Sequence, residues 1–500
     1  MKILHTLPTK ITALLVALAV TGLLATGCDF LDPTGVENPR TTDEDLAAAT
    51  QPVRSLLPGV RAQFARALGS TVVATAVGTD DYSIHGTGLG GNAMDFPEQI
   101  NPNTAVINST GASLGTYWNL QELRALASFL LEEIAPGDER ATDAQLAETH
   151  FYRGVGALMQ AENYSYVPLA RDEAPVPASQ LFAVAEEDLL AVLSLDGGGD
   201  FALPAEAALA RLYRGTGDAT QAAQYAQSVL DEDPAFLFQQ EYDAQNLVNA
   251  AHLFIVTRAL KELQPLPRLD FLDPKFTSRS SGISVSKAEE MHLILAEVAL
   301  DADQEADARQ HLLDALDVVD ARPSVSFFDN DERLDDELNP RPRSSEIQIA
   351  FEPGGEFVEG LVLDRPCPDG EECVVTPSVS GTSVTAEQIN DASGTELVRL
   401  LYLMRQEIML LEGRRLHDLG MRFPMMLTEI EQNASIAVGD PGTEMVIPAY
   451  IPPSNELDLY EPVVIYDGDE LIEDQITMLH DMNRVLAEQR GLLVSNPDVP

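Results

Sequence analysis

Cysteine, lysine and aromatic residues are scarce in this 500-residue chain. It contains 3 cysteines, 1 tryptophan and 6% aromatic residues, and lysine occurs only at positions 2, 10, 261, 275 and 287 among 31 basic residues. Three cysteines cannot build a disulfide-rich scaffold. A zinc or iron–sulfur site needs about four suitable ligands, and neither the cysteines nor the 8 scattered histidines form such a group in the sequence. We therefore expect no metal centre.

Positive charge is also scarce. The 31 lysine and arginine residues are outnumbered by 80 acidic residues, which gives a formal net charge of -49 at pH 7. Such a chain repels phosphate backbones, so nucleic acid is excluded as a partner. Because the acidic residues are spread along the chain, we interpret the charge as a solvating surface suited to a salty habitat. A functional acidic surface that captures cations or basic peptides is the alternative.

Catalytic motifs are absent from the sequence. It has no HExxH or GxSxG run, and among 80 acidic residues no carboxylate pair is singled out for glycoside hydrolysis. The glycine-rich run at 86–91 lacks the preceding strand and following helix of a phosphate loop. The acidic run at 329–339 lacks the glycine and spacing of a calcium loop, so a solvated loop is favoured over calcium binding. We expect a binding protein without a cofactor, not an enzyme.

The first residues have the features of a secretory signal peptide. Lys2 and Lys10 precede an uncharged apolar run that is too short to span a membrane, and small residues follow directly before Cys28. This predicts a lipoprotein signal peptide at residues 1–27, lipidation of Cys28 after cleavage, and a lipidated tether at 28–40. An ordinary signal peptide with an incidental cysteine is the alternative. No later apolar run has spanning length, so we expect a domain anchored to the membrane by its lipid.

The two remaining cysteines, Cys367 and Cys373, bracket the run Pro-Asp-Gly-Glu-Glu. In an oxidising compartment this spacing predicts a local disulfide that closes a loop. A metal site would need further ligands, and none adjoins them in the sequence.

Helical repeats predict the fold of residues 41–500, which we expect to form one domain. Residues 203–236 place apolar, small and turn residues at the marker positions of the tetratricopeptide unit, a helix pair of about 34 residues. These residues are Leu209, Ala210, Tyr213, Gly217, Ala222 and Pro234. A weaker copy begins near residue 289, with markers Leu295, Ala296, Ala308, Leu312 and Ala315. Small alanines allow two helices to approach closely, so the fold class is mostly α with a tetratricopeptide-like core.

The remaining elements complete this predicted architecture. Repeat helices are expected at about 115–161, 203–236, 287–320 and 395–419. Loop insertions are expected at about 78–112, 322–394 and 424–470, where proline, glycine and aspartate are frequent. Alternating residues at 345–352 and 357–363 predict at most a small β-hairpin.

The segment 395–424 is strongly amphipathic. Its apolar residues recur at steps of three and four, which predicts a helix that starts at a capping box formed by Ser393 and Glu396 and runs to residue 419. The recurring apolar residues are Leu397, Leu401, Met404, Ile408 and Leu411. On the charged face, Arg405, Glu412, Arg415 and Asp418 recur at steps of seven and three residues, within ion-pair reach on such a helix.

The run EGRRLHDL at 412–419 resembles the C-terminal signature of the SusD/RagB family of outer-membrane nutrient-binding lipoproteins, which is close to E-G-x-R-x-x-D-L. The matching residues are Glu412, Gly413, Arg415, Asp418 and Leu419. The family's Glu-Leu pair before this signature is displaced, because Ile408 occupies its first position and Glu407 lies one residue earlier. Three more segments resemble the family: the tether with its Leu-Asp, residues 148–169 with Arg153, and IPPSNEL at 451–457.

This resemblance implies a surface-exposed outer-membrane lipoprotein that binds a nutrient, commonly an oligosaccharide or other glycan, and delivers it to a TonB-dependent SusC-like transporter. Because aromatic residues are few, a peptide or other small nutrient is an alternative ligand. An alternative of a different class is a lipid-anchored helical-repeat scaffold that assembles envelope proteins and binds no small ligand. An α-helical glycoside hydrolase is a third hypothesis.

Candidate functional residues follow from these expectations. Ligand contacts are expected in the loops at 78–112 and 322–394, with Tyr82 and His85 as the first candidates. Trp118 is expected to pack in the core, and stacking on a ligand is its alternative role. The signature residues are interpreted as a structural clasp that fixes the C-terminal helix against the repeats, and a solvated helix face is the alternative. They are Arg405, Glu412, Gly413, Arg415 and Asp418.

Overall fold

The computed structural model describes residues 50–84, 91–195, 199–256, 263–273, 275–327, 348–350, 353–359, 374–453, 466–467, 470–471 and 475–493. The chain divides into two units, residues 1–52 and 53–500, and nearly all described residues belong to the second. In the described part of the chain, no helix combines the length and the hydrophobicity that a membrane span requires.

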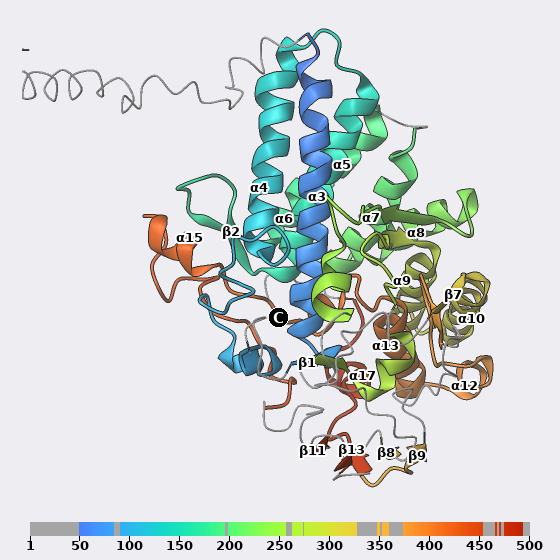
Figure 1. The fold of residues 1–500 in the computed structure, drawn as a ribbon. Coiled ribbons are helices and arrows are strands. Elements are labelled where there is room, and N and C mark those ends of the chain that lie inside the picture. The colour runs from blue at the N-terminus through green and yellow to red at the C-terminus, as the bar shows by residue number, and fades with distance from the viewer. Residues whose placement is uncertain are drawn as a thin grey trace, which may run out of the picture. The chain divides into compact units, whose positions relative to one another are not determined.

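Helix α3 (Pro52–Val77) lies between α4 (Thr116–Ser128) and α5 (Asp143–Asn163) (Figure 1). It contacts both through buried side chains. The rings of Phe64 on α3 and Tyr152 on α5 have centroids 4.6 Å apart, and the hydroxyls of Thr71 and Thr116 lie 3.0 Å apart. Helix α5 begins at a capping box, because the Thr142 and Gln145 side chains bond each other's backbone N–H groups.

Three pairs of helices follow one another within the described residues. They are α5 with α6 (Ala178–Leu195), α7 (Ala202–Thr216) with α8 (Ala219–Glu232), and α9 (Ala288–Asp301) with α10 (Glu305–Ala321). Between α7 and α8, Gly217 takes a φ of 79°, and the Asp218 side chain accepts the backbone N–H of Gln221 to cap α8. The repeat pairs predicted at 203–236 and 287–320 are therefore confirmed, and the fold is mostly α with a tetratricopeptide-like core.

The strands form six small sheets in the described part of the chain. The antiparallel pairs are β1 (Tyr82–Ile84) with β5 (Leu263–Pro265), β2 (Tyr166–Pro168) with β3 (Pro175–Pro177), β4 (Leu237–Gln240) with β6 (Ile283–Lys287), β7 (Ser324–Phe327) with β10 (Val374–Pro377), and β11 (Tyr466–Asp467) with β12 (Glu470–Leu471). The hairpin predicted from 345–352 and 357–363 is present as β8 (Gln348–Ala350) and β9 (Val358–Glu359), and β13 (Gln475–Thr477) pairs parallel to β8.

Short helical elements occupy parts of the predicted loop insertions. In chain order they include the single turns Gly91–Asp95 and Pro97–Gln99, then α12 (Ala386–Asp391) and α15 (Leu427–Gln432). Another short helix, α17 (Met482–Val485), follows the last of these insertions. The turns Phe129–Ile134 and Leu486–Arg490 are wider than an α-helix and continue α4 and α17.

The helix predicted at 395–419 is two helices, α13 (Thr395–Ile408) and α14 (Arg415–Asp418). The chain turns between them because Leu411 and Gly413 have φ values of 57° and 77°, which a right-handed helix cannot contain. The capping box predicted at Ser393 is also wrong. Gly394 is the N-cap of α13 and has no side chain to accept a hydrogen bond.

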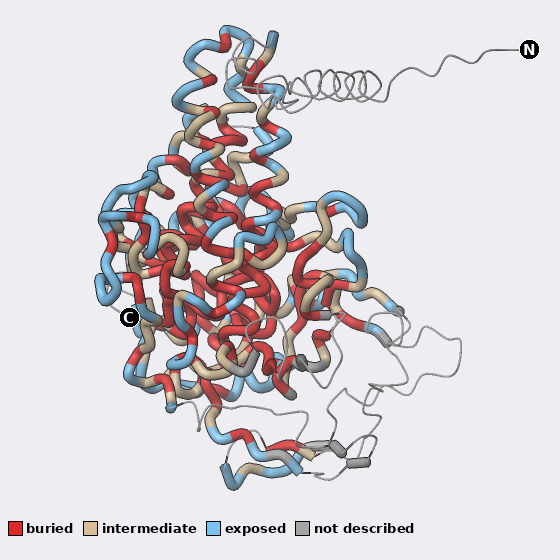
Figure 2. Tube along the Cα trace, turned by 60° about the vertical axis from the view of Figure 1, so that its left-hand side comes forward, coloured by how far each residue is buried: buried red, intermediate tan, exposed pale blue. Residues whose placement is uncertain are grey.

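Buried residues concentrate on the inner faces of the packed helices, and exposed residues follow their outer faces and the loops (Figure 2). Most of the buried apolar residues belong to one large cluster that includes Phe64, Leu123 and Phe151. A smaller cluster joins α9 and α10 to α12 and α13 through residues such as Leu312 and Leu401. This second cluster attaches the signature segment to the last helix pair.

Candidate ligand-binding site

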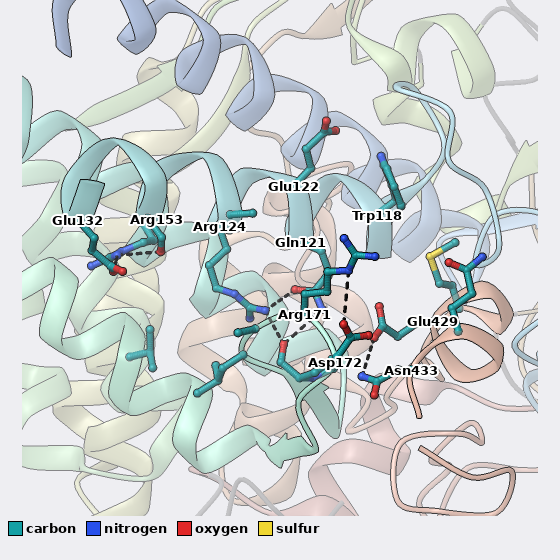
Figure 3. Close-up of a pocket in the computed structure, with 18 of the residues that line it drawn as sticks. Trp118, Gln121, Glu122, Arg124, Glu132, Arg153, Arg171, Asp172, Glu429 and Asn433 are labelled. Carbon is teal, nitrogen blue, oxygen red and sulfur yellow. Dashed lines mark hydrogen bonds and ion pairs between the residues drawn. The ribbon is translucent and has the colours of Figure 1, made fainter. Parts of the chain in front are cut away.

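A pocket opens between α4, the turn that joins β2 to β3, α6 and α15 (Figure 3). Its volume is about 960 Å³, near the upper end of the range of about 300–1,000 Å³ for small-ligand sites. Its lining includes Trp118, Gln121 and Glu122 of α4, Arg171 and Asp172 of the turn, Glu187 of α6, and Glu429, Gln432 and Asn433 in or next to α15. Elements far apart in the sequence thus build one site.

Trp118 presents its indole ring at this pocket. Its side chain is 40% exposed, whereas its neighbours on α4, Tyr117 and Leu120, are buried. The helix turns positions 117 and 120 inward and leaves position 118 on the outer face. This corrects the expectation that Trp118 packs in the core. An exposed ring beside polar groups offers a flat apolar surface for a ligand.

Polar side chains of the pocket remain available to a ligand. Among the described residues, Glu122, Glu187 and Gln432 form no hydrogen bond or ion pair with another side chain. Arg171 is 95% exposed and pairs with Asp172 at 3.6 Å, a contact between solvated groups that is easily exchanged. Carboxylate, amide and guanidinium groups suit the hydroxyls of a polyol, since they offer both acceptors and donors.

The rim of the pocket is fixed by hydrogen bonds between its two sides. Ser435 Oγ donates to the carbonyl oxygen of Asp172 at 3.0 Å, and Asn433 Nδ2 donates to that of Glu173 at 2.9 Å. Asp172 has a φ of 62°, in the left-handed region that aspartate tolerates better than most residues. The side-chain bonds hold this turn in place, so the site is formed before a ligand arrives.

Two arginines form the inner wall. Arg153 donates to Asp188 at 2.8 Å and to Glu132 at 2.7 Å. Arg124 donates to Gln160 at 2.8 Å, and its burial lowers the pKa of the guanidinium to about 10. Arg153 is the arginine of the 148–169 segment, which resembles the SusD/RagB family. It lies in the wall of this pocket, where Asp188 and Glu132 hold it in place.

The predicted ligand residues lie elsewhere. Tyr82 is on strand β1, is 2% exposed, and donates its hydroxyl to Asp273 Oδ1 at 3.1 Å. This corrects the expectation that Tyr82 lies on an open loop, and in this structure it presents no surface to a ligand. His85 lies outside the described residues, as do Cys28, Cys367, Cys373 and the run 329–339. Lipidation and the disulfide therefore stay predictions.

The signature residues are buried and paired, which rules out a solvated helix face. Arg405 binds Asp418, with nitrogen–oxygen distances of 3.1 and 3.2 Å. Both nitrogens on one edge of Arg415 bind Asp80 at 2.6 Å. The expected pairs of Glu412 with Arg405 and Arg415 do not form, because the chain breaks between α13 and α14.

Glu412 instead binds two buried lysines. Its Oε1 lies 2.5 Å from Lys275 Nζ and 2.6 Å from Lys287 Nζ. The same ammonium groups donate to the carbonyl oxygens of Leu410 at 2.9 Å and Ile408 at 2.7 Å, where α13 ends. The last carbonyl groups of a helix have no hydrogen-bond donor within the helix, and here the two lysines are the donors. Two of the five lysines in the sequence thus have a structural role at the signature.

Asp81 makes stability depend on pH. Asp81 is buried next to Asp80 and accepts a hydrogen bond from Gln406 at 3.1 Å. Its burial, and after it the negative charge of Asp80, raise the pKa of Asp81 to about 7. A carboxyl group with a raised folded-state pKa stabilises fully below its unfolded pKa of about 4, and this contribution is lost as pH rises through 7. We expect Asp81→Asn to gain roughly 1–3 kcal/mol relative to wild type between pH 5 and pH 8.

Urea unfolding at pH 5, 6, 7 and 8 measures this difference. Asp231→Asn, at an exposed position on α8, is the control and should follow wild type at each pH. Parallel stability curves for Asp81→Asn and wild type would show that Asp81 is ionised throughout this range.

Sequence reasoning missed most of the pocket. It placed ligand contacts in other loops and left α15 and the β2–β3 turn out. The turn does carry a usable signal, since the charged run Arg171-Asp172-Glu173 lies between Pro168 and Pro175, which mark the two strands. Nothing in the sequence indicates that α15, more than 250 residues later, closes the same site.

The fold is that of a helical-repeat protein, and its pocket is a candidate small-ligand site. No known family profile and no curated protein matches the chain. Solved structures similar to it include a laminarin binding SusD-like protein, at 15% identity, covering 77% of this chain and 95% of that one with a TM-score of 0.47.

Two further similar structures are a SusD-like carbohydrate binding protein from Bacteroides vulgatus and NanU of B. fragilis. The first has 13% identity, covers 73% of this chain and 82% of that one, and has a TM-score of 0.46. The second has 12% identity, covers 83% and 97%, and has a TM-score of 0.47. The run at 412–419 resembles the signature of the family that these SusD-like proteins represent.

Proposed function

We propose that this protein is a surface-exposed, lipid-anchored outer-membrane protein that binds an oligosaccharide in the α4–α15 pocket and delivers it to a TonB-dependent SusC-like transporter. The observation that carries the proposal is the combination of an exposed Trp118 ring with unpaired planar polar groups in a preformed pocket. The stated binding of laminarin and of carbohydrate by two structurally similar proteins agrees with this ligand class. The proposal includes no catalysis.

The charges of the pocket favour a neutral oligosaccharide over an anionic one. Its lining contains six carboxylates and three arginines: Glu122, Glu132, Asp172, Glu187, Asp188 and Glu429, with Arg124, Arg153 and Arg171. Arg124 and Arg153 are engaged by protein groups, which leaves Arg171 as the accessible cation of the lining. An acidic sugar would therefore meet mostly like charge.

Trp118 gives a direct assay, because it is the single tryptophan of the chain. We expect neutral oligosaccharides that bind to change its fluorescence, and Trp118→Ala to weaken binding about 30-fold in calorimetry, since a central tryptophan is worth about 2 kcal/mol in many interfaces. Leu190→Ala is a matched control, because Leu190 is also 40% exposed but lies outside the pocket lining.

Different outcomes would contradict the proposed binding site and the proposed function. Oligosaccharide binding that leaves Trp118 fluorescence unchanged and survives Trp118→Ala would contradict the site. Absence of binding across a panel of neutral, acidic and amino oligosaccharides would contradict the function and favour the scaffold alternative.

Delivery to a transporter is tested separately from ligand binding. Purification of the full chain from native membranes should recover a large outer-membrane barrel protein, and the gene of such a receptor should adjoin that of this protein. Recovery of other envelope proteins without a barrel would instead favour the scaffold.

A further inference from the structure

Three potential metal ligands meet where α9 packs against α10. His292 comes from α9, and His311 and Asp314 come from α10. One ligand atom of each residue lies within 4.8 Å of those of the other two. His311 and Asp314 are one helical turn apart and so lie on one face of α10. The helix pair thus assembles a group that sequence spacing conceals.

Both histidines have an unsatisfied nitrogen. Their Nδ1 atoms are buried and have no hydrogen-bond partner among the described residues. The two ring centroids are 6.1 Å apart with an interplanar angle of 39°. Buried polar atoms without partners are rare, and two on facing imidazoles need an explanation, of which a bound ion is one.

The carboxylate of Asp314 is already oriented. Gln310 Nε2 donates to Asp314 Oδ1 at 2.8 Å, which leaves Oδ2 for another partner. Metal-binding carboxylates are commonly held in this way by an outer hydrogen bond. The group therefore has two imidazoles, one positioned carboxylate and an outer partner.

We propose that His292, His311 and Asp314 bind a divalent transition-metal ion, such as Zn²⁺, that links α9 to α10. Imidazole ligands suit Zn²⁺, Cu²⁺ and Ni²⁺, whereas Ca²⁺ and Mg²⁺ prefer oxygen ligands. Small side-chain rotations bring such atoms to the usual ligand distance of about 2.0–2.2 Å. Three protein ligands leave a fourth position for water or another small donor.

Calorimetry with ZnCl₂ on the full chain in detergent tests this site. Excess Ca²⁺ and Mg²⁺ in the buffer occupies sites made of surface carboxylates, which are abundant in a chain with 80 acidic residues. We expect one equivalent of Zn²⁺ to bind the wild type under these conditions. His292→Gln and His311→Gln should each weaken this binding at least about 10-fold, and His480→Gln, which lies outside the group, should not.

Melting temperature gives a second readout. Zn²⁺ should raise that of the wild type and of His480→Gln, but not that of Asp314→Asn, because an ion that binds the native state stabilises it. The Asp314→Asn variant keeps both histidines and the shape of the side chain, so it also serves where a glutamine variant fails to fold. Unchanged Zn²⁺ affinity in all three ligand variants, or no site that survives excess Ca²⁺ and Mg²⁺, overturns the proposal.

Discussion

Replacing Glu412 with alanine is expected to destabilise the protein by about 3–5 kcal/mol. Glu412 is 1% exposed and its carboxylate binds both Lys275 and Lys287, which are buried as well. Without it, two ammonium groups lie close together with no anion within bonding distance among the described residues. Removing one partner of a buried ion pair costs far more than removing an exposed pair, because the charge that stays behind remains desolvated.

The pH dependence of this variant identifies the cause. Burial lowers the pKa of Lys275 to about 8, although Glu412 opposes this shift. Loss of Glu412 lowers that pKa further. A lysine whose folded-state pKa is depressed binds fewer protons when folded, so stability rises with pH from the folded pKa up to the unfolded value of about 10.4. We therefore expect the deficit of Glu412→Ala to be largest near pH 6 and smaller at pH 9.

Urea unfolding of the variant at both pH values checks these expectations. Glu232→Ala is the matched control, because Glu232 is exposed at the end of α8 and its loss should change stability by less than about 0.5 kcal/mol. Adding Lys287→Met to Glu412→Ala should recover part of the loss, since one unpaired charge disappears. Unchanged stability combined with loss of ligand binding would contradict a structural role for Glu412.

The helical part of the fold follows from local sequence patterns. Small residues at repeat spacing predict α7 and α8, with Gly217 between them, because these features act over a few residues. The same kind of pattern was wrong at 395–419. The apolar period continues to Leu411, but buried lysines bind the last carbonyl groups of α13 and the chain turns there. Gly413 was the local sign of this break.

Long-range pairing explains why the sites were harder to predict. Arg415 and Asp80 are 335 residues apart, and Glu412 and Lys275 are 137 apart. In a chain with 80 acidic residues, no local rule selects these partners. The same holds for the pocket, where Trp118 meets α15 only through the tertiary fold, and for His292 and His311 on separate helices.

The second large effect is expected for Asp418→Asn. Asp418 is 2% exposed and lies between two buried arginines, with Oδ1 2.9 Å from Arg214 Nη1 and 3.1 Å from Arg405 Nη2. Asparagine keeps the shape of the side chain but not its charge. Arg214 retains Glu297, whereas Arg405 loses the one carboxylate that it binds among the described residues. We expect a loss of about 3–5 kcal/mol in the free energy of unfolding.

The pH dependence of the free energy of unfolding distinguishes this variant from Glu412→Ala. Burial opposes ionisation of Asp418, but Arg405 and Arg214 outweigh it and hold the pKa of Asp418 far below its usual range. A depressed carboxyl pKa gives stability that is present above the unfolded pKa of about 4 and is lost only as pH falls through the folded value. The deficit of Asp418→Asn should therefore be nearly constant from pH 5 to pH 8, where that of Glu412→Ala changes.

Unfolding in urea across pH 5–8, with Asp231→Asn as an exposed control, measures this loss. A loss below about 1 kcal/mol would show that the two arginines are solvated well enough to do without Asp418. Oligosaccharide binding adds a second test, because the pocket lining does not include Asp418. Folded Asp418→Asn should keep wild-type affinity, and weaker binding at unchanged stability would instead give the signature segment a direct part in ligand capture.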